Sequence, residues 1–172
     1  KDVVKVILNQ YKKIELNKSF IGIEKVIDYK KRKSKNTWIA TDNWISGMMK
    51  HFIEFANDNL FYYDLKKWSD PIQYTVYDEY NSHYQWYCDI MNSTFYSNII
   101  RKLSISLILS DPSDYEGGEF QIMHLGEDKM TTIKPPIGTA IIFPSTTRHR
   151  VRPIKSGKRI SLVGWYGGPP FR

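Results

Sequence analysis

The feature that most constrains the fold is a change in the hydrophobic pattern at Pro71. Beyond it, apolar residues fall in short runs separated by turn residues, and no helical repeat lies between the runs. The eight runs that we predict as strands are Ile72–Tyr77, His83–Cys88, Lys102–Leu109, Glu119–Leu125, Lys129–Ile133, Thr139–Phe143, His149–Ile154 and Arg159–Tyr166. Turn sequences such as Gly117-Gly118 and Pro135-Pro136 separate several of them. This spacing predicts an antiparallel sandwich or barrel.

Two segments before Pro71 have helical periodicity instead. Apolar residues between Val3 and Ile14 share one face, with lysines opposite them. A second apolar stripe runs from Trp44 to Phe55 and follows Asp42 and Asn43, either of which can cap a helix. Helices followed by strands predict an α+β fold, with the N-terminal helices packed on one sheet. We expect one domain over residues 1–172, in which residues 1–70 give helical and strand support and residues 71–172 form the β core.

Composition narrows the cellular setting and the partners. The 172 residues carry a formal net charge of +7, which suits an acidic partner. A single cysteine cannot form an internal disulfide, and no apolar run reaches the roughly 18 residues of a membrane span. These features predict a cytoplasmic protein without a membrane partner. The basic run Lys30–Lys35 could contact phosphates, but a solvated charged loop explains it better, so we do not expect a nucleic-acid partner.

Several reaction classes lack their motifs in this chain. The sequence contains no G-x-S-x-G elbow, Walker loop or dinucleotide fingerprint, and one cysteine cannot build a thiolate zinc site. A spaced set of polar residues remains late in the chain. His149 opens a predicted strand, Arg159 follows ten residues later, and Ser161 lies on the same strand face as Arg159. Pro153 and Gly157 predict a hairpin that would bring these two strands side by side.

An earlier strand adds a carboxylate to this set. Asp89 closes that strand, sixty residues before His149. A carboxylate and an imidazole at strand ends are ligand types of non-haem iron sites. An arginine in the same barrel could bind the carboxylate of a co-substrate through its planar guanidinium.

At these residues the chain resembles a known family, the Fe(II)/2-oxoglutarate-dependent oxygenases of the prolyl-hydroxylase type. The resemblance covers more than half of the chain, from Tyr77 to Arg172. The segments that carry it are Tyr77 with His83-Tyr84-Gln85-Trp86-Tyr87-Cys88-Asp89, Arg101-Lys102-Leu103-Ser104, Ser110-Asp111-Pro112 with Tyr115-Glu116-Gly117-Gly118-Glu119, and Pro144-Ser145 with His149-Arg150-Val151, Pro153, Gly157 and Arg159. Arg32-Lys33-Ser34 and Trp38-Ile39 are similar as well. Members of this family fold as a double-stranded β-helix, which agrees with the predicted strands.

The resemblance implies a role for each matching residue. Asp89 and His149 match two of the three iron ligands, and Arg159 matches the residue that anchors the distal carboxylate of 2-oxoglutarate. Ser161 would assist that carboxylate, and Tyr77 matches an aromatic residue of the co-substrate pocket. The implied cofactor is Fe(II) and the implied co-substrate is 2-oxoglutarate, with ascorbate as a further candidate.

The chain departs from the family at the first ligand. The family pattern is His-x-Asp, whereas this sequence has Tyr87-Cys88-Asp89. His83 is no substitute, because ligands on one strand face lie two residues apart and His83 lies six residues from Asp89. Tyr87 ligates the metal, or it swings away and water takes its place, or the site is inactive. We expect weak metal binding through Asp89 and His149, with Tyr87 at or near the metal.

The expected activity is the hydroxylation of a C–H bond, with release of succinate and CO2. Peptidyl proline is the substrate class that the resemblance suggests, although related barrels act on other side chains and on small molecules. The alternative is a catalytically silent binding module that uses the same pocket for a peptide or co-substrate. A nucleic-acid binder that uses the +7 charge ranks third.

Overall fold

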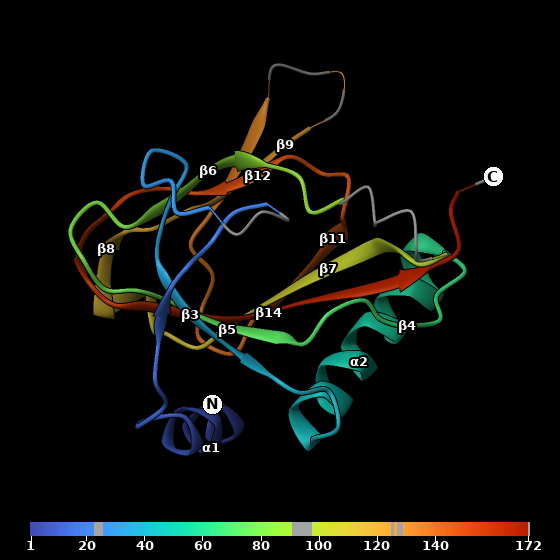
Figure 1. The fold of residues 1–172 in the computed structure, drawn as a ribbon, viewed down its shortest axis with the longest axis horizontal. Coiled ribbons are helices and arrows are strands. Elements are labelled where there is room, and N and C mark those ends of the chain that lie inside the picture. Colours follow the sequence, from blue (N-terminus) through green and yellow to red (C-terminus); the bar gives the residue numbers. More distant parts are fainter. Residues whose placement is uncertain (23–25, 91–97, 125, 127–128, 172) are drawn as a thin grey trace.

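Two antiparallel sheets face each other in the computed structural model, which describes residues 1–22, 26–90, 98–124, 126 and 129–171 (Figure 1). The helices are α1 (Asp2–Gln10) and α2 (Trp44–Ala56), with a π-helical turn at Asn57–Phe61 and a 3-10 turn at Pro112–Asp114. The strands are β1 (Asn17–Lys18), β2 (Arg32–Lys33), β3 (Lys35–Ile39), β4 (Lys67–Trp68), β5 (Ile72–Tyr77), β6 (His83–Tyr87), β7 (Ile100–Ile108), β8 (Tyr115–Gly117), β9 (Phe120–Met123), β10 (Met130–Ile133), β11 (Ala140–Pro144), β12 (His149–Val151), β13 (Ile154–Gly157) and β14 (Arg159–Gly168).

The larger sheet has the order β1-β3-β5-β14-β7-β11, and β4 also pairs with β14. Its centre is the longest strand, β14, which pairs antiparallel with both β5 and β7. The smaller sheet has the order β10-β9-β12-β6-β2, and β13 pairs with β8 in a separate ribbon. This arrangement is the predicted double-stranded β-helix.

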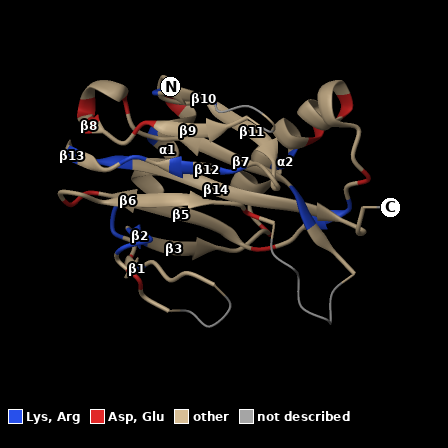
Figure 2. Cartoon of the chain, turned by 90° about the horizontal axis from the view of Figure 1, so that it is seen from above, with Lys and Arg blue, Asp and Glu red and all other residues tan. Residues whose placement is uncertain are grey.

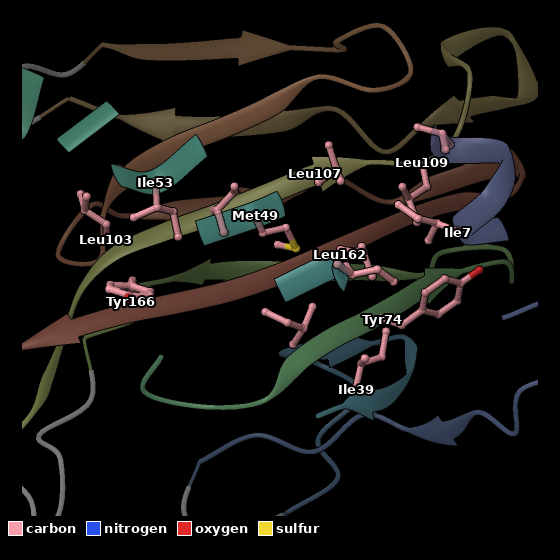
Figure 3. Close-up of a cluster of buried hydrophobic side chains, with 14 of the residues drawn as sticks. Ile7, Ile39, Met49, Ile53, Tyr74, Leu103, Leu107, Leu109, Leu162 and Tyr166 are labelled. Carbon is pink, nitrogen blue, oxygen red and sulfur yellow. The ribbon is translucent and has the colours of Figure 1, made fainter. Parts of the chain in front are cut away.

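Both helices pack on the larger sheet, as predicted. Val4 and Ile7 of α1 and Ile45, Met49 and Ile53 of α2 are buried in one apolar cluster with residues of β5, β7 and β14. Figure 3 shows side chains of this cluster between the helices and the sheet. The helices therefore seal one face of the larger sheet, and its other face is left to the interior between the sheets.

A second apolar cluster fills part of the space between the two sheets. It consists of Tyr77, Tyr115, Phe120, Phe143, Val151 and Ile154. Burying these aromatic and aliphatic surfaces holds the sheets together and surrounds the polar residues between them with low-dielectric walls.

The predicted hairpin between His149 and Arg159 is wrong. β12 lies in the smaller sheet and β14 in the larger one, so the two strands are not neighbours. Between them β13 pairs with β8, with Ile154 opposite Gly117. The chain thus uses Pro153 and Gly157 to cross between sheets rather than to turn back.

The basic run is also more ordered than the predicted loop. Arg32 and Lys33 form β2, and β3 begins at Lys35. Lys33 and Lys35 lie 3.4 and 3.1 Å from the carboxylate of Glu79, which neutralises part of the run. Figure 2 shows lysine and arginine along β2 and β12. These ion pairs with Glu79 explain how a lysine-rich segment can form β2 of the smaller sheet and β3 of the larger one.

The ends of other elements differ modestly from the expectation. Helix α1 ends at Gln10, before Ile14, and the run predicted over His149–Ile154 divides into β12 and β13. The predicted strand end at Leu125 lies outside the described residues. Among the helices of the described ranges, none is long and apolar enough to cross a membrane.

Candidate metal and co-substrate site

Tyr87 and His149 lie opposite each other across the β6–β12 pair. Val151 pairs with Tyr84, so β6 carries one more residue than β12 between these two positions. Such a bulge resets the alternation of side chains along the strand. Tyr84 and Tyr87 consequently stack on each other, with ring centroids 3.6 Å apart.

Asp89 and His149 form a buried polar pair beside that stack. The Nε2 atom of His149 lies 3.4 Å from Oδ2 of Asp89, and both side chains are almost fully buried. The other imidazole nitrogen, Nδ1, lies 2.9 Å from the carbonyl oxygen of Thr147, which fixes the ring orientation. Asp89 Oδ2 has no hydrogen-bond partner within the described part of the chain. A carboxylate oxygen without a partner and an imidazole nitrogen this close fit a shared cation.

Tyr87 occupies the position next to this pair. Its ring centroid lies 4.2 Å from that of His149. Burial, together with the negative charge of Asp89, raises the pKa of the Tyr87 phenol well above 10, and burial raises the pKa of Tyr84 to about 12. The described residues contain no cluster of three or more His, Cys, Asp or Glu side chains that could hold a metal. The protein ligands at hand are therefore one carboxylate, one imidazole and a phenol.

His83 has a structural environment. Its Nδ1 lies 2.7 Å from the carbonyl oxygen of Asn81, and its Nε2 lies 3.2 Å from that of Lys30. Both ring nitrogens thus face backbone acceptors. A shifted motif that recruits His83 is unnecessary.

The residues predicted to bind the co-substrate lie on the larger sheet. Arg159 of β14 pairs with Tyr77 of β5, and its guanidinium carbon lies 5.6 Å from the centroid of the Tyr77 ring. Nη1 of Arg159 donates a hydrogen bond of 3.3 Å to Oγ of Ser161. Nη2 is buried and makes no hydrogen bond to the described residues. A buried guanidinium with a free donor is suited to an anionic ligand.

Two residues near Arg159 were not among the predicted site residues. A Cβ on Gly118 would lie 3.3 Å from Cδ of Arg159 and 2.4 Å from Cδ1 of Ile154, so this position needs glycine. Burial raises the pKa of the Tyr115 phenol, and the neighbouring Arg159 opposes that shift. Both residues lie in the segment Tyr115–Glu119, whose resemblance to the family was the available signal.

The aromatic interior connects the two polar groups. The His149 ring packs against Phe143, with centroids 4.6 Å apart, and against Phe120 at 5.5 Å. Both phenylalanines share one apolar cluster with Tyr77, which contacts Arg159. The smaller sheet thus supplies the histidine and the larger sheet the arginine, on two sides of one apolar wall.

A cavity of about 1210 Å³ adjoins the site. Tyr77, Tyr87 and Asp89 lie in its wall together with residues that we had not predicted as functional. Among these are Arg32, Trp38, Gln73, Trp86, Arg101 and Trp165. The cavity is large enough to hold a molecule beside the Asp89–His149 pair.

Comparison with known families agrees with this geometry. The 2OG-Fe(II) oxygenase superfamily matches residues 72–167, which is more than half of the chain. The chain belongs to this superfamily. The match covers every residue of the predicted ligand and co-substrate set, from Tyr77 to Ser161.

Curated relatives of this oxygenase-family chain are PKHD-type hydroxylases. It is 49% identical to one from Picosynechococcus sp. over 63 residues, which are 37% of this chain and 28% of the relative. It is 42% identical to one from Synechococcus sp. (strain CC9902) over 87 residues, which are 51% of this chain and 37% of the relative. The chain thus spans only about a third of the length of these relatives.

Solved structures show the same fold at low sequence identity. A prolyl hydroxylase from Trichoplax adhaerens, in complex with a peptide fragment of the hypoxia inducible factor oxygen degradation domain, matches with a TM-score of 0.76 and 20% identity. The match covers 96% of this chain and 76% of that one. A Pseudomonas putida prolyl-4-hydroxylase gives a TM-score of 0.71 and 20% identity, over 96% of this chain and 85% of that one.

Proposed function

We propose that this chain is a Fe(II)- and 2-oxoglutarate-dependent dioxygenase of the prolyl-hydroxylase type. The reaction is R–H + O2 + 2-oxoglutarate → R–OH + succinate + CO2. The observation that carries the proposal is the buried pair of Asp89 Oδ2 and His149 Nε2, 3.4 Å apart, with no hydrogen-bond partner for the carboxylate oxygen in the described residues. The superfamily match supports it.

We assign the iron to Asp89 and His149, with Tyr87 at the third protein position. When bound, Fe(II) would supply the activation of O2, with 2-oxoglutarate as the co-substrate. Thr147 holds the imidazole through Nδ1, so Nε2 faces the carboxylate. The aromatic wall of Phe120 and Phe143 keeps water away from His149.

We assign the distal carboxylate of 2-oxoglutarate to Arg159, with Ser161 and Tyr77 beside it. Nη2 of Arg159 has the free donor that a carboxylate would accept from, while Ser161 holds Nη1. The substrate then enters through the cavity that Tyr87 and Asp89 border. A peptidyl residue is the proposed target, which the peptide bound to the Trichoplax enzyme supports by analogy.

Tyr87 lowers the activity in this proposal. Its ring is held between Tyr84 and His149, and burial raises the phenol pKa, so the neutral side chain is a poor ligand for Fe(II). This observation also favours the alternative function, a silent module that binds a peptide or co-substrate without turnover.

The test is Fe(II)-dependent release of succinate from 2-oxoglutarate, with ascorbate present as the reductant. The chain and Tyr87→His are compared under identical conditions, and Tyr87→His/His149→Ala is the control. We expect at least about tenfold more succinate from Tyr87→His, since a neutral imidazole nitrogen as the third protein ligand binds Fe(II) better than a phenol does. Equal turnover would show that Tyr87 is tolerated. If neither the chain nor Tyr87→His releases succinate although metal is bound, the result would support the binding module.

A further inference from the structure

We infer that Arg32 forms an anion site in the cavity beside Tyr87 and Asp89, and that the substrate presents a carboxylate to it. The inference deepens the proposed function, on which it rests for calling the bound molecule a substrate. Arg32 lies on β2 at the edge of the smaller sheet and lines the same cavity as Tyr87 and Asp89.

Arg32 is buried, and the part of the chain that the structure describes gives it no acidic partner. Its exposed fraction is 6%, and no Asp or Glu of the described residues comes within 4.0 Å of its guanidinium. Asp28 is near in sequence, but it accepts a hydrogen bond from Arg32 only through its backbone carbonyl. The Oδ1 atom of Asp28 accepts from the backbone N–H of Lys30. Burying a cation without a counter-charge is costly, so a ligand anion is the expected partner.

The second arginine of the cavity provides the contrast. Arg101 donates through Nε and Nη2 to the two carboxylate oxygens of Asp70, both at 2.8 Å. Its guanidinium also stacks on Trp165, at 4.1 Å from the ring centroid. This charge is satisfied within the protein. Of the two arginines in the wall, Arg32 is therefore the one available to a ligand.

Neutral groups hold the Arg32 guanidinium in a fixed orientation. Nε donates to Oγ of Ser34 at 2.9 Å, and Nη2 donates to Oε1 of Gln73 at 2.8 Å. Gln73 Oε1 also accepts from Thr75 Oγ1, at 3.0 Å. The guanidinium carbon lies 4.6 Å from the centroid of the Tyr84 ring. These contacts orient the fork in advance, which lowers the entropy that a ligand must overcome.

One donor atom of Arg32 remains available. Nη1 makes no hydrogen bond to a described residue, and it is not among the solvent-inaccessible atoms that lack a partner. It therefore reaches open space, and the space that Arg32 lines is the cavity. One guanidinium surrounded by amide and hydroxyl groups suits a singly charged planar anion. That chemistry is a carboxylate, either at a free C-terminus or on an acidic side chain.

The test measures binding to the iron-free chain, so its outcome does not depend on turnover. The probes are N-acetyl-L-proline against N-acetyl-L-prolinamide, for a terminal carboxylate, and N-acetyl-L-aspartic acid α-amide against N-acetyl-L-asparaginamide, for a side-chain carboxylate. Quenching of tryptophan fluorescence reports binding, because Trp38, Trp86 and Trp165 line the cavity. We expect at least one acid to bind about tenfold more tightly than its amide, as a charge-assisted hydrogen bond would give.

Variants connect that preference to Arg32. We expect Arg32→Gln to bind acid and amide within about twofold of each other, and Arg32→Lys to keep part of the preference. Lys31→Gln is the matched control, since Lys31 is an exposed cation of the same cavity, and it should keep the full preference. Equal loss in Lys31→Gln would overturn the inference in favour of general charge attraction. Saturating 2-oxoglutarate should leave probe binding unchanged, and displacement of the acid would assign Arg32 to the co-substrate instead.

A measurement on the unmodified chain covers the case in which Arg32→Gln does not fold. Raising NaCl from about 50 to about 300 mM should weaken acid binding by less than about threefold, because a buried pair is screened less than a surface pair. A steeper loss, or no acid preference for either probe pair, would overturn the inference. If the acid preference fails these tests but succinate is still produced, the inference about Arg32 is wrong and the proposed dioxygenase function is retained. An acid preference without succinate production would support the binding module.

Discussion

At the scale of single residues, metal affinity tests the proposed roles of Tyr87 and Asp89. We expect Tyr87→His to bind Mn²⁺ at least about tenfold more tightly than the unchanged chain, since imidazole replaces a buried phenol whose pKa is raised. Asp89→Asn should weaken binding at least about tenfold, because it removes the charged ligand. Titration by electron paramagnetic resonance measures both. His51→Gln, an exposed position on α2, should change nothing, and unchanged affinity in Asp89→Asn would contradict the assigned site.

The sequence contains the residue types of this site but not their surroundings. The sequence could indicate Asp89, His149 and Arg159 as candidates because few residue types can bind a metal ion or a carboxylate. The Tyr84–Tyr87 stack depends on a bulge in β6, and no feature of the local sequence predicts that bulge. The burial of Arg32 could not be predicted from the sequence, because it results from strands that are distant in sequence. Local patterns identify chemistry, whereas tertiary packing decides which groups lack partners.

At the scale of elements, helix α2 depends on its cap. The side chain of Asn43 accepts hydrogen bonds from the backbone N–H groups of Ile45 and Ser46, which settles the choice between Asp42 and Asn43. We expect Asn43→Ala to lower the free energy of unfolding by about 1 kcal/mol, the usual contribution of such a cap. Urea denaturation measures it. Asp42→Ala serves as the control and should change stability by less than half as much.

A second element-scale prediction concerns the attachment of β2 and β3 to the end of β5. The hydrogen bonds from Lys35 and Lys33 lower the pKa of the Glu79 carboxyl. A lowered folded-state pKa stabilises the fold above the unfolded-state pKa of about 4.3, and this contribution is lost as the pH falls through the folded value. Glu79→Gln should therefore cost under about 1 kcal/mol at pH 7, because the pair is exposed, and the difference should disappear in acid. A loss that persists in acid, measured by urea denaturation against Glu15→Gln, would contradict this cause.

The elements also show where sequence patterns suffice. Short apolar runs bounded by turn residues located the central strands within a few residues, because β5, β7 and β14 are buried along most of their length on both faces. The wrong hairpin at Pro153 and Gly157 has a different cause, since turn residues specify that a chain bends but not which sheet it joins. Short edge strands such as β1 and β4 have too few residues for any period to be visible.

At the scale of the whole molecule, the residues of the proposed site come from both sheets. Asp89 and His149 come from the end of β6 and from β12 of the smaller sheet, while Arg159, Ser161 and Tyr77 lie on β14 and β5 of the larger one. A metal ion bound to the first set and a co-substrate bound to the second would link the two sheets. Both sets are assembled only in the folded state. Ligand that binds only the folded chain raises stability by RT ln(1 + [L]/Kd). Each ligand that orders one side should lower the entropic cost of binding the other.

We therefore expect Mn²⁺ and 2-oxoglutarate together to raise the melting temperature by more than the sum of their separate shifts. Differential scanning fluorimetry measures all three. Arg159→Met should keep the shift caused by Mn²⁺ and lose most of that caused by 2-oxoglutarate, because it removes the buried guanidinium whose Nη2 has no protein partner in the described chain. Its ligand-free stability should be little changed, since an apolar side chain replaces a buried unpaired charge. Strictly additive shifts would mean that the two sheets bind their ligands independently, and that neither sheet's ligand prepares the other's site.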